Sequence, residues 1–311
     1  MVSVKGNWTI AVIVLMAAAA AVLSTSVGLR QSLGLFMEPM VRGTGISVSG
    51  FGLAMAIQNL AWGIGQPFMG GLADRYGGRG VILVAALFYA IGLVLMGTAG
   101  ISGLMIGGGL LIGLATAGTS FGVIVGEVSR GVSPEIRQTV VSIVAAAGSI
   151  GTFVLAPVAQ EMIEGIGWKA GLFIFAGLAL AISMMAMPLK VNGGKTGAAA
   201  RSEANAGKAI REAMSHPGFL AMTAAFFACG FQLIFVATHL PNYISICGLP
   251  PSVGAQSLAL IGGCNAVGTL VIGKLGQRYG NKLMLAIVYM GRTTAIVAYV
   301  MLPVSVESTL I

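Results

Sequence analysis

The chain alternates long apolar stretches with short polar ones. An α-helix needs about 20 residues to cross a bilayer. Apolar runs of about that length or longer lie at about 9–40, 50–69, 80–99, 103–126, 138–160, 168–189, 218–247, 253–272 and 283–303. The first run is too long, and too poor in a cleavage signature, to be a removed signal peptide. The pattern predicts an all-α polytopic membrane protein with about nine transmembrane helices.

A single polar stretch is long enough to separate two parts of the chain. Residues 190–217 are rich in Gly, Ala, Lys, Arg, Ser and Glu, a composition typical of a flexible linker. We therefore expect a six-helix bundle at 1–189, a cytoplasmic linker at 190–217 and a further bundle of about three helices at 218–311.

Two loops about 200 residues apart have nearly the same sequence. Residues 70–79 read GGLADRYGGR and residues 273–282 read GKLGQRYGNK, each between two apolar runs. Gly28 and Pro39 also match Gly230 and Pro241 at one fixed offset. Such a repeat is typical of transporters built from two related halves. By symmetry the second half should also have six helices, twelve in all, so the chain is either a fragment or has an incomplete second half.

Composition supports a membrane location. Hydrophobic residues make up 57% of the chain and charged residues only 8%, against about 25% in soluble domains. The 47 glycines are scattered through the apolar runs, where small residues let membrane helices pack closely. A net charge of +8 could indicate nucleic acid, but the basic residues collect in short loops on one side of the membrane, so we expect no nucleic-acid partner.

Loop charges set the predicted orientation. With the amino terminus in the cytoplasm, 13 of the 17 Lys and Arg residues are cytoplasmic, two (Arg42 and Lys169) are outside, and Arg30 and Arg292 lie within spans. This asymmetry follows the positive-inside rule. We expect a multi-pass protein of the cell's inner (plasma) membrane with the lipid bilayer as its surroundings, acting as a monomer.

The repeated loops resemble the signature between helices 2–3 and 8–9 of the major facilitator superfamily. Residues 28–36 (GLRQSLGLF) and 229–241, with Asn265 to Gly268 after them, resemble the oxalate/formate antiporter and monocarboxylate porter group. The resemblance covers nearly the whole chain. It implies a helical bundle that works by alternating access, with a small-molecule substrate, a possible role for a coupling ion and no cofactor.

The first loop carries charges that can act as a gate. Asp74 lies at the end of a predicted helix beside Arg75 and within reach of Arg79, so its carboxylate can pair with both and with a helix N-terminus. Glycines there permit close helix approach and a tight turn. The alternative is that the charges only set topology. The candidate gating residues are Gly70, Asp74, Arg75, Gly77, Arg79, Gly273, Gln277, Arg278 and Lys282, and Gln277 in place of the acid predicts a weaker second latch.

Charged residues within membrane spans are costly and usually functional. Arg30 therefore is the first candidate for contact with an anionic substrate, although at its depth the side chain could instead extend to the outer interface. His239 could carry a proton or simply be a satisfied polar residue near Pro241. The candidate substrate-binding residues are Arg30, Gln31, Gln232, His239 and Asn265, and further amides and hydroxyls that could bind a polar substrate or tie helices together are Gln58, Asn59, Thr119, Ser120 and Asn242.

These features favour a secondary transporter for a small organic anion, a monocarboxylate. Oxalate-type porters carry an arginine where this chain has Thr269, and no acid lies in any apolar run except Glu38 near one end, so a dicarboxylate clamp is not expected. The alternatives are an efflux carrier for apolar or cationic compounds and a non-transporting membrane sensor or scaffold. No nucleophile–base pair, metal cluster or phosphate loop is present in the sequence, so we expect no enzyme.

Overall fold

The computed structural model describes residues 9–100, 102–189, 211–301, 305–306 and 309. The described residues contain helices and connecting turns and no strand. This confirms the predicted all-α class. Most of the predicted linker, at residues 190–210, lies outside the described residues, so the division into two bundles stays a prediction.

Ten helical elements lie among the described residues before the predicted linker. They are α1 (Ile10–Ser32), the 3₁₀ helix η1 (Leu33–Phe36), α2 (Met37–Thr44), α3 (Val48–Tyr76), α4 (Gly78–Thr98), α5 (Ser102–Gly118), α6 (Phe121–Gly131), α7 (Pro134–Ile166), α8 (Trp168–Met185) and the 3₁₀ helix η2 (Met187–Leu189). After it come α10 (Pro217–Ile246), α11 (Pro251–Tyr279) and α12 (Asn281–Met301). Their bounds follow the predicted apolar runs, extended at most ends into the flanking polar residues.

Two predicted runs are interrupted rather than continuous. The first, 9–40, is α1 followed by η1 and α2, because Pro39 has no N–H for the carbonyl of Leu35 and its ring crowds that carbonyl. The run 103–126 is divided into α5 and α6 at Thr119 and Ser120. The Thr119 hydroxyl donates to the carbonyl of Ala115, a local bond that competes with regular helix geometry.

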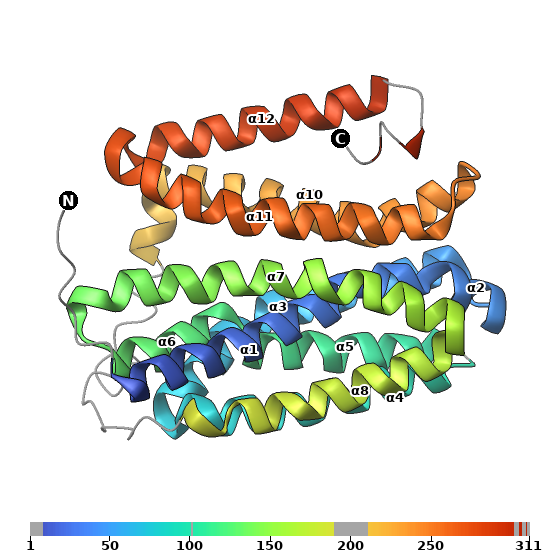
Figure 1. The fold of residues 1–311 in the computed structure, drawn as a ribbon, viewed down its shortest axis with the longest axis horizontal. Coiled ribbons are helices and arrows are strands. Elements are labelled where there is room, and N and C mark those ends of the chain that lie inside the picture. Colours follow the sequence, from blue (N-terminus) through green and yellow to red (C-terminus); the bar gives the residue numbers. More distant parts are fainter. Residues whose placement is uncertain (1–8, 101, 190–210, 302–304, 307–308, 310–311) are drawn as a thin grey trace.

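The long helices lie side by side along the long axis of the molecule (Figure 1). Helix α7 packs against α1 on one side and α11 on the other, and thereby joins the first set of helices to the second. Helix α3 packs against α5, and α4 against both α5 and α8. Helix α10 contacts α11 and η1, so a helix from late in the chain lies against the end of the first one.

Seven of the helical segments are long and apolar enough to cross a membrane, judged on the described residues alone. The predicted spans at 50–69 and 283–303 correspond to α3 and α12, which are not among these seven. Helix α3 carries the amides of Gln58, Asn59 and Gln66 within its length, and α12 carries Arg292. Both helices nevertheless lie alongside the others in the bundle (Figure 1).

The surface and interior have the polarity expected of a protein in lipid. Large apolar side chains such as Phe226, Phe227 and Phe231 are mostly exposed, whereas the polar side chains of Ser26 and Gln58 are almost completely buried. In a bilayer an exposed apolar surface costs nothing, and polar groups must find partners inside the bundle. A polar interior is therefore where a site for a polar solute can be formed.

Candidate functional site

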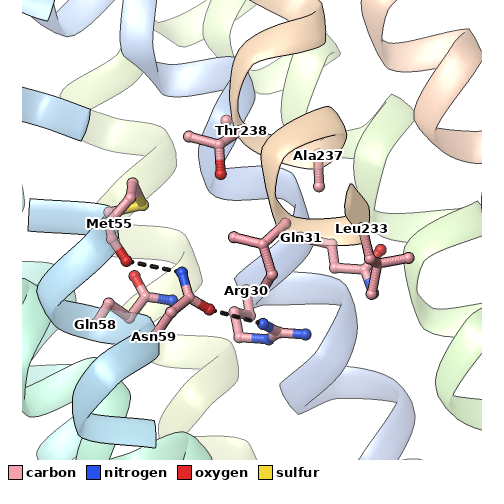
Figure 2. Close-up of a pocket in the computed structure, with 10 residues that line it drawn as sticks. Arg30, Gln31, Met55, Gln58, Asn59, Leu233, Ala237 and Thr238 are labelled. Atoms are coloured by element: carbon pink, nitrogen blue, oxygen red, sulfur yellow. Dashed lines mark hydrogen bonds between the residues drawn. The ribbon is translucent and has the colours of Figure 1, made fainter. Parts of the chain in front are cut away.

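The site is centred on Arg30, near the end of α1. The side chain is turned into the bundle, and the residue is 9% exposed. It lines a pocket between α1, α3 and α10, which are brought together by the packing of η1 on α10 (Figure 2). Of the two positions that the sequence allowed for this side chain, the structure shows the one inside the bundle.

The Arg30 guanidinium is held by neutral groups only. Its Nη1 donates to Asn59 Oδ1 at 3.3 Å, and its central carbon lies 4.4 Å from the centroid of the Trp62 ring. Asn59 is oriented in turn by its own amide nitrogen, which donates to the Met55 carbonyl at 2.7 Å (Figure 2). The Nε of Arg30 is buried without a hydrogen-bond partner, and among the described residues no carboxylate forms an ion pair with this side chain.

This environment leaves a positive charge uncompensated. Contact with an aromatic face is worth about 2 kcal/mol when the pair is desolvated. The effective cost of burying an ion is several kcal/mol. One neutral hydrogen bond and one ring therefore do not offset the burial of the Arg30 charge, and an anion beside its free Nε would do so directly.

The pocket combines a few polar groups with an apolar wall. It is lined by Arg30, Gln31, Gly34, Met55, Gln58, Asn59, Leu233, Ile234, Ala237 and Thr238. Its volume is about 20 Å³, room for about one water molecule. An organic anion can therefore enter only when α10 and α1 move apart, which is a motion of one set of helices against the other.

The predicted substrate residues do not all meet at this pocket. Gln31 lines it beside Arg30, whereas Gln232 on α10 has a buried, unpartnered Oε1 but is not part of the lining. His239 lies against Phe235 with the two rings tilted and their centroids 5.0 Å apart, and it does not line the pocket. Asn265 on α11 is exposed, and its carbonyl accepts a hydrogen bond from Thr269 at 2.7 Å.

Three residues of α3 near Arg30 differ in whether the sequence predicted them. Asn59 and Gln58 belong to the wider set of amides that the sequence marked as possible ligands. Trp62 was not predicted, although it follows Gln58 by four residues and Asn59 by three. That spacing places the three side chains on one face of α3, and it was the signal available in the sequence.

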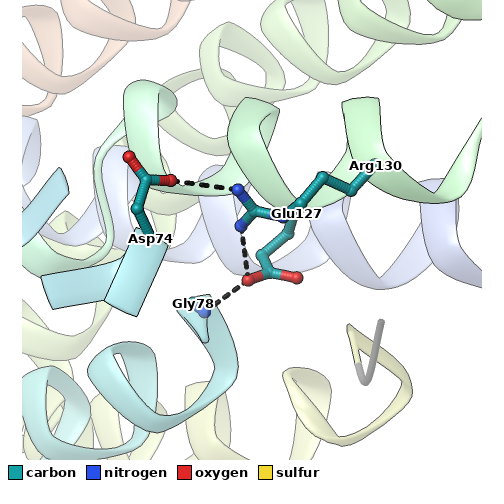
Figure 3. Close-up of polar contacts among 4 residues, drawn as sticks. All are labelled: Asp74, Gly78, Glu127 and Arg130. Carbon is teal, nitrogen blue, oxygen red and sulfur yellow. Dashed lines mark hydrogen bonds and ion pairs between the residues drawn. The ribbon is translucent and has the colours of Figure 1, made fainter. Parts of the chain in front are cut away.

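A second cluster lies at the end of α3, in the first copy of the repeated loop. Arg130 of α6 donates to Asp74 at 3.0 Å and to Glu127 at 2.7 Å (Figure 3). The Glu127 carboxylate also accepts the backbone N–H of Gly78, the first residue of α4. Because the first N–H groups of a helix have no intrahelical partner, Glu127 stabilises the start of α4 through both charge and hydrogen bonding.

This cluster corrects two expectations. Asp74 was expected to pair with Arg75 and Arg79, but its ion pair among the described residues is with Arg130, which is 56 positions away in the sequence. The Arg75 guanidinium lies instead over the Tyr76 ring, 5.4 Å from its centroid. Gly70 was expected to permit close helix approach, yet a side-chain carbon at that position would meet nothing within 4 Å.

The loops of the repeat share one backbone conformation. Gly77 has φ 88° and ψ 139°, and its counterpart Gly280 has φ 87° and ψ 141°. A positive φ of this kind is accessible to glycine without strain, so the tight turn predicted for Gly77 is present in both copies. Lys282 is exposed, and the side chains of Gln277 and Arg278, like the surroundings of Gly273, lie outside the described part of the structure.

At the opposite end of the bundle the two sets of helices are in contact. The Ser245 hydroxyl of α10 donates to the Glu38 carboxylate of α2, which also pairs with Arg42 at 2.7 Å. Gly34 lies so close to the Ala237 carbonyl of α10 that a side-chain carbon there would collide with it. This end of the bundle is therefore closed in the structure.

A bundle of membrane-length helices with a polar pocket between its two sets defines a class, the polytopic membrane proteins that enclose a polar site. Residues 7–311 match the family model described as Major Facilitator Superfamily. The chain belongs to the major facilitator superfamily. Its family consists of transporters, which are not enzymes, in agreement with the sequence-based expectation.

Similar proteins include a curated relative and several solved structures. Mouse "Monocarboxylate transporter 11" is 29% identical over 195 residues, covering 60% of this chain and 41% of that protein. This chain thus matches about two fifths of the length of the curated relative.

The solved structures resemble this chain in fold. The xylose transporter XylE from E. coli, in a partially occluded inward-open conformation, has a TM-score of 0.69 at 16% identity, over 96% of this chain and 82% of that one. The nucleoside transporter NupG has a TM-score of 0.66 at 16% identity, over 88% of this chain and 69% of that one.

Proposed function

We propose that this protein is a secondary carrier that moves a small organic anion, a monocarboxylate, by alternating access. It would lie in the cell's inner membrane with its amino terminus in the cytoplasm and act as a monomer. The main support for this proposal is the environment of Arg30. Its side chain is a buried cation with a free donor and no acidic partner among the described residues, and it lines a pocket where two sets of helices meet.

A single carboxylate fits this site better than two. Arg30 is the one charged residue among those that line the pocket in the described structure. The other lining residues contribute amides, one hydroxyl and apolar groups. One guanidinium balances one negative charge, so a second carboxylate would be buried without a counter-ion. The curated relative that is named as a monocarboxylate transporter supports the same substrate class.

Two regions of the bundle would change during transport: the closed end around Glu38 and Ser245, and the charged cluster around Arg130. The contacts of Ser245 with Glu38 and of Ala237 with Gly34 hold α10 against the first helices on the predicted outer side. Alternating access requires these contacts to open while the opposite end closes. We assign the gating role on the predicted cytoplasmic side to Asp74 and Arg130, together with the loop residues proposed from the sequence, and Glu127 holds Arg130 in place.

The test is ligand-dependent stabilisation of the purified protein. Binding to the folded state raises the unfolding temperature by mass action, so the assay requires no knowledge of the coupling ion. We expect propanoate to stabilise the wild type and to have no effect on Arg30→Gln. Arg137→Gln is the matched control, because that arginine is exposed and does not line the pocket, and it should respond as the wild type does.

Two results would contradict the proposal. Carboxylates could stabilise Arg30→Gln as strongly as the wild type, which would remove Arg30 from the site. Alternatively, lipophilic cations could stabilise the protein whether or not Arg30 is present, which would place the protein among efflux carriers.

A further inference from the structure

Helix α5 is packed tightly against the helices beside it. A side-chain carbon at four of its glycines would collide with α3 or α4, and these are Gly108, Gly109, Gly113 and Gly118. At three of the four positions the nearest atom is a backbone carbonyl oxygen, which cannot turn aside as a flexible side chain can. Close backbone approach of this kind holds membrane helices firmly together, so α5 is fixed in the bundle.

Helix α6, which follows α5 in the chain, is packed less closely. One face of α6 is buried, but its interior glycines, Gly122 and Gly126, have room around them. A side-chain carbon at these positions would meet only the side chains of Ser120 and Arg130, at 3.7 Å or farther. At these two positions α6 can therefore shift without a collision between backbones.

Thr119 and Ser120 interrupt the helix between these two parts. Ser120 has extended backbone angles, φ −70° and ψ 160°, and its N–H donates to the carbonyl of Ala117, three residues back rather than four. Hinges in proteins are a few residues at the ends of elements that absorb a change in φ and ψ. A fixed helix, an interruption and a less closely packed helix, in this order, are the parts of a hinge with one movable side.

The interruption is tied to α1 by a pair of hydroxyls. Ser26 Oγ lies 2.6 Å from Thr119 Oγ1, and both residues are 1% exposed. Because the Thr119 hydroxyl donates to the Ala115 carbonyl, it accepts from Ser26. The Tyr89 hydroxyl donates to the Ser26 carbonyl at 3.1 Å, so this turn of α1 is bonded to α4 as well. These bonds fix the position of the interruption beside α1.

The far end of α6 is held to α3 and α4 by charged groups (Figure 3). Arg130 donates to Asp74, whose side chain is 62% exposed, and Glu127 accepts the N–H of Gly78. Exposed ion pairs contribute little to stability, so the contact with Asp74 can open readily. Movement of α6 away from α4 would also break the Glu127 bond.

We infer that Thr119 and Ser120 form a hinge, about which α6 moves as an arm while α5 stays fixed. The movement carries Arg130 away from Asp74 on the predicted cytoplasmic side. Thr119 and Ser120 are thus positioning residues for Arg130, and the bond from Ser26 keeps the pivot of the arm against α1. The gating role of the arm rests on the proposed function, whereas its movement does not.

The experiment measures distances between pairs of spin labels on the purified full chain, without added anion. One pair joins Gly131, the last residue of α6, to Met184 near the end of α8, and both positions are exposed. The control pair joins Leu72 of α3 to Met184, because α3 and α8 should not move. The native cysteines are first replaced by serine, and these are Cys229, Cys247 and Cys264.

Asp74→Asn combined with Glu127→Gln removes the charges that hold the arm. The wild type should show one distance for the α6 pair, and this variant should show a second. An 11-residue helix is about 16 Å long, so a bend of about 20° moves its end by about 5 Å. Arg130→Gln, which removes both ion pairs through their shared arginine, should give the same second distance. The control pair should keep one distance throughout.

Thr119→Ala combined with Ser120→Ala tests the hinge itself. Alanine has the highest helix propensity and no hydroxyl to compete for backbone hydrogen bonds, so α5 and α6 should join into one helix. Loss of the charges at the far end should then produce no second distance. Thr116→Ala is the matched control, because its hydroxyl bonds within α5, and it should retain the second distance. Unfolding temperatures show whether each variant is folded.

Three results would overturn the inference. The α6 pair could keep one distance when the charges are removed, which would show that α6 is fixed. The control pair could change together with it, which would show that the whole set of helices moves. The second distance could also persist in the variant with both alanines, which would place the hinge elsewhere. None of these results depends on an anion, so each leaves the proposed substrate and the role of Arg30 to their own test.

Discussion

At the scale of single residues, the account depends on how Arg30 is tolerated inside the bundle. Its guanidinium has one hydrogen bond to Asn59 and one aromatic face, that of Trp62. Asn59 is therefore a positioning residue. It fixes one edge of the guanidinium and leaves the Nε on another edge without a hydrogen-bond partner. An anion that binds there meets a donor whose direction is already set.

A prediction follows for Asn59→Leu. Removing the acceptor leaves a buried charged donor unpaired, so the free energy of unfolding should fall by about 1–3 kcal/mol. The measurement is a double-mutant cycle with Arg30→Met, using unfolding of the purified protein. In the Arg30→Met background the Asn59→Leu substitution should cost much less, because the buried guanidinium is no longer present.

Additive losses in that cycle would contradict the contact between the two side chains. The cycle does not require transport. It therefore tests the geometry of the site separately from its function.

At the scale of helices, the charged cluster joins α3, α4 and α6. Glu127 is buried and Asp74 is mostly exposed, although both bind the same arginine. The two acids should therefore have different roles. Glu127 stabilises the start of α4, whereas Asp74, at the surface, is free to exchange partners during the transport cycle.

This difference predicts opposite results for two neutral substitutions. Glu127→Gln should lower the free energy of unfolding by roughly 1–3 kcal/mol, because the carboxylate at the N-terminus of α4 is lost. Asp74→Asn should leave expression and stability largely unchanged and slow transport. Thermal unfolding and initial transport rates of both variants in proteoliposomes provide the comparison.

Normal transport rates in Asp74→Asn would reject the gating role of this residue. A stability equal to that of the wild type in Glu127→Gln would reject the contribution of its carboxylate to the start of α4.

The helices could be predicted well from the sequence, and their contacts less well. Apolar runs gave the position of each long helix, because a span needs a minimum apolar length whatever it packs against. The partner of Asp74 was missed because Arg130 follows it by 56 positions, and only packing of α6 beside α3 brings them together. The interruption at residues 33–36 and the stacking of Trp62 under Arg30 likewise depend on local geometry that apolarity does not encode.

At the scale of the whole molecule, the fold explains how a small pocket can serve a carrier. Helix α10 contacts η1 at one end, and α11 packs on α7 along the bundle. Motion of these helices as a unit would widen the pocket without disturbing the contacts among α3, α4 and α5. The solved structures with the same fold include inward-open forms of a xylose transporter, so this fold is known to adopt open states.

The most direct test of the central claim is anion exchange in proteoliposomes. Vesicles loaded with unlabelled propanoate should accumulate labelled propanoate when they contain the wild type or Arg137→Gln. Vesicles with Arg30→Gln should show no exchange above protein-free vesicles, although the variant is folded. Exchange by Arg30→Gln at the wild-type rate, or none by a wild type that is folded, would contradict the claim that this buried arginine carries the anion site of a transporter.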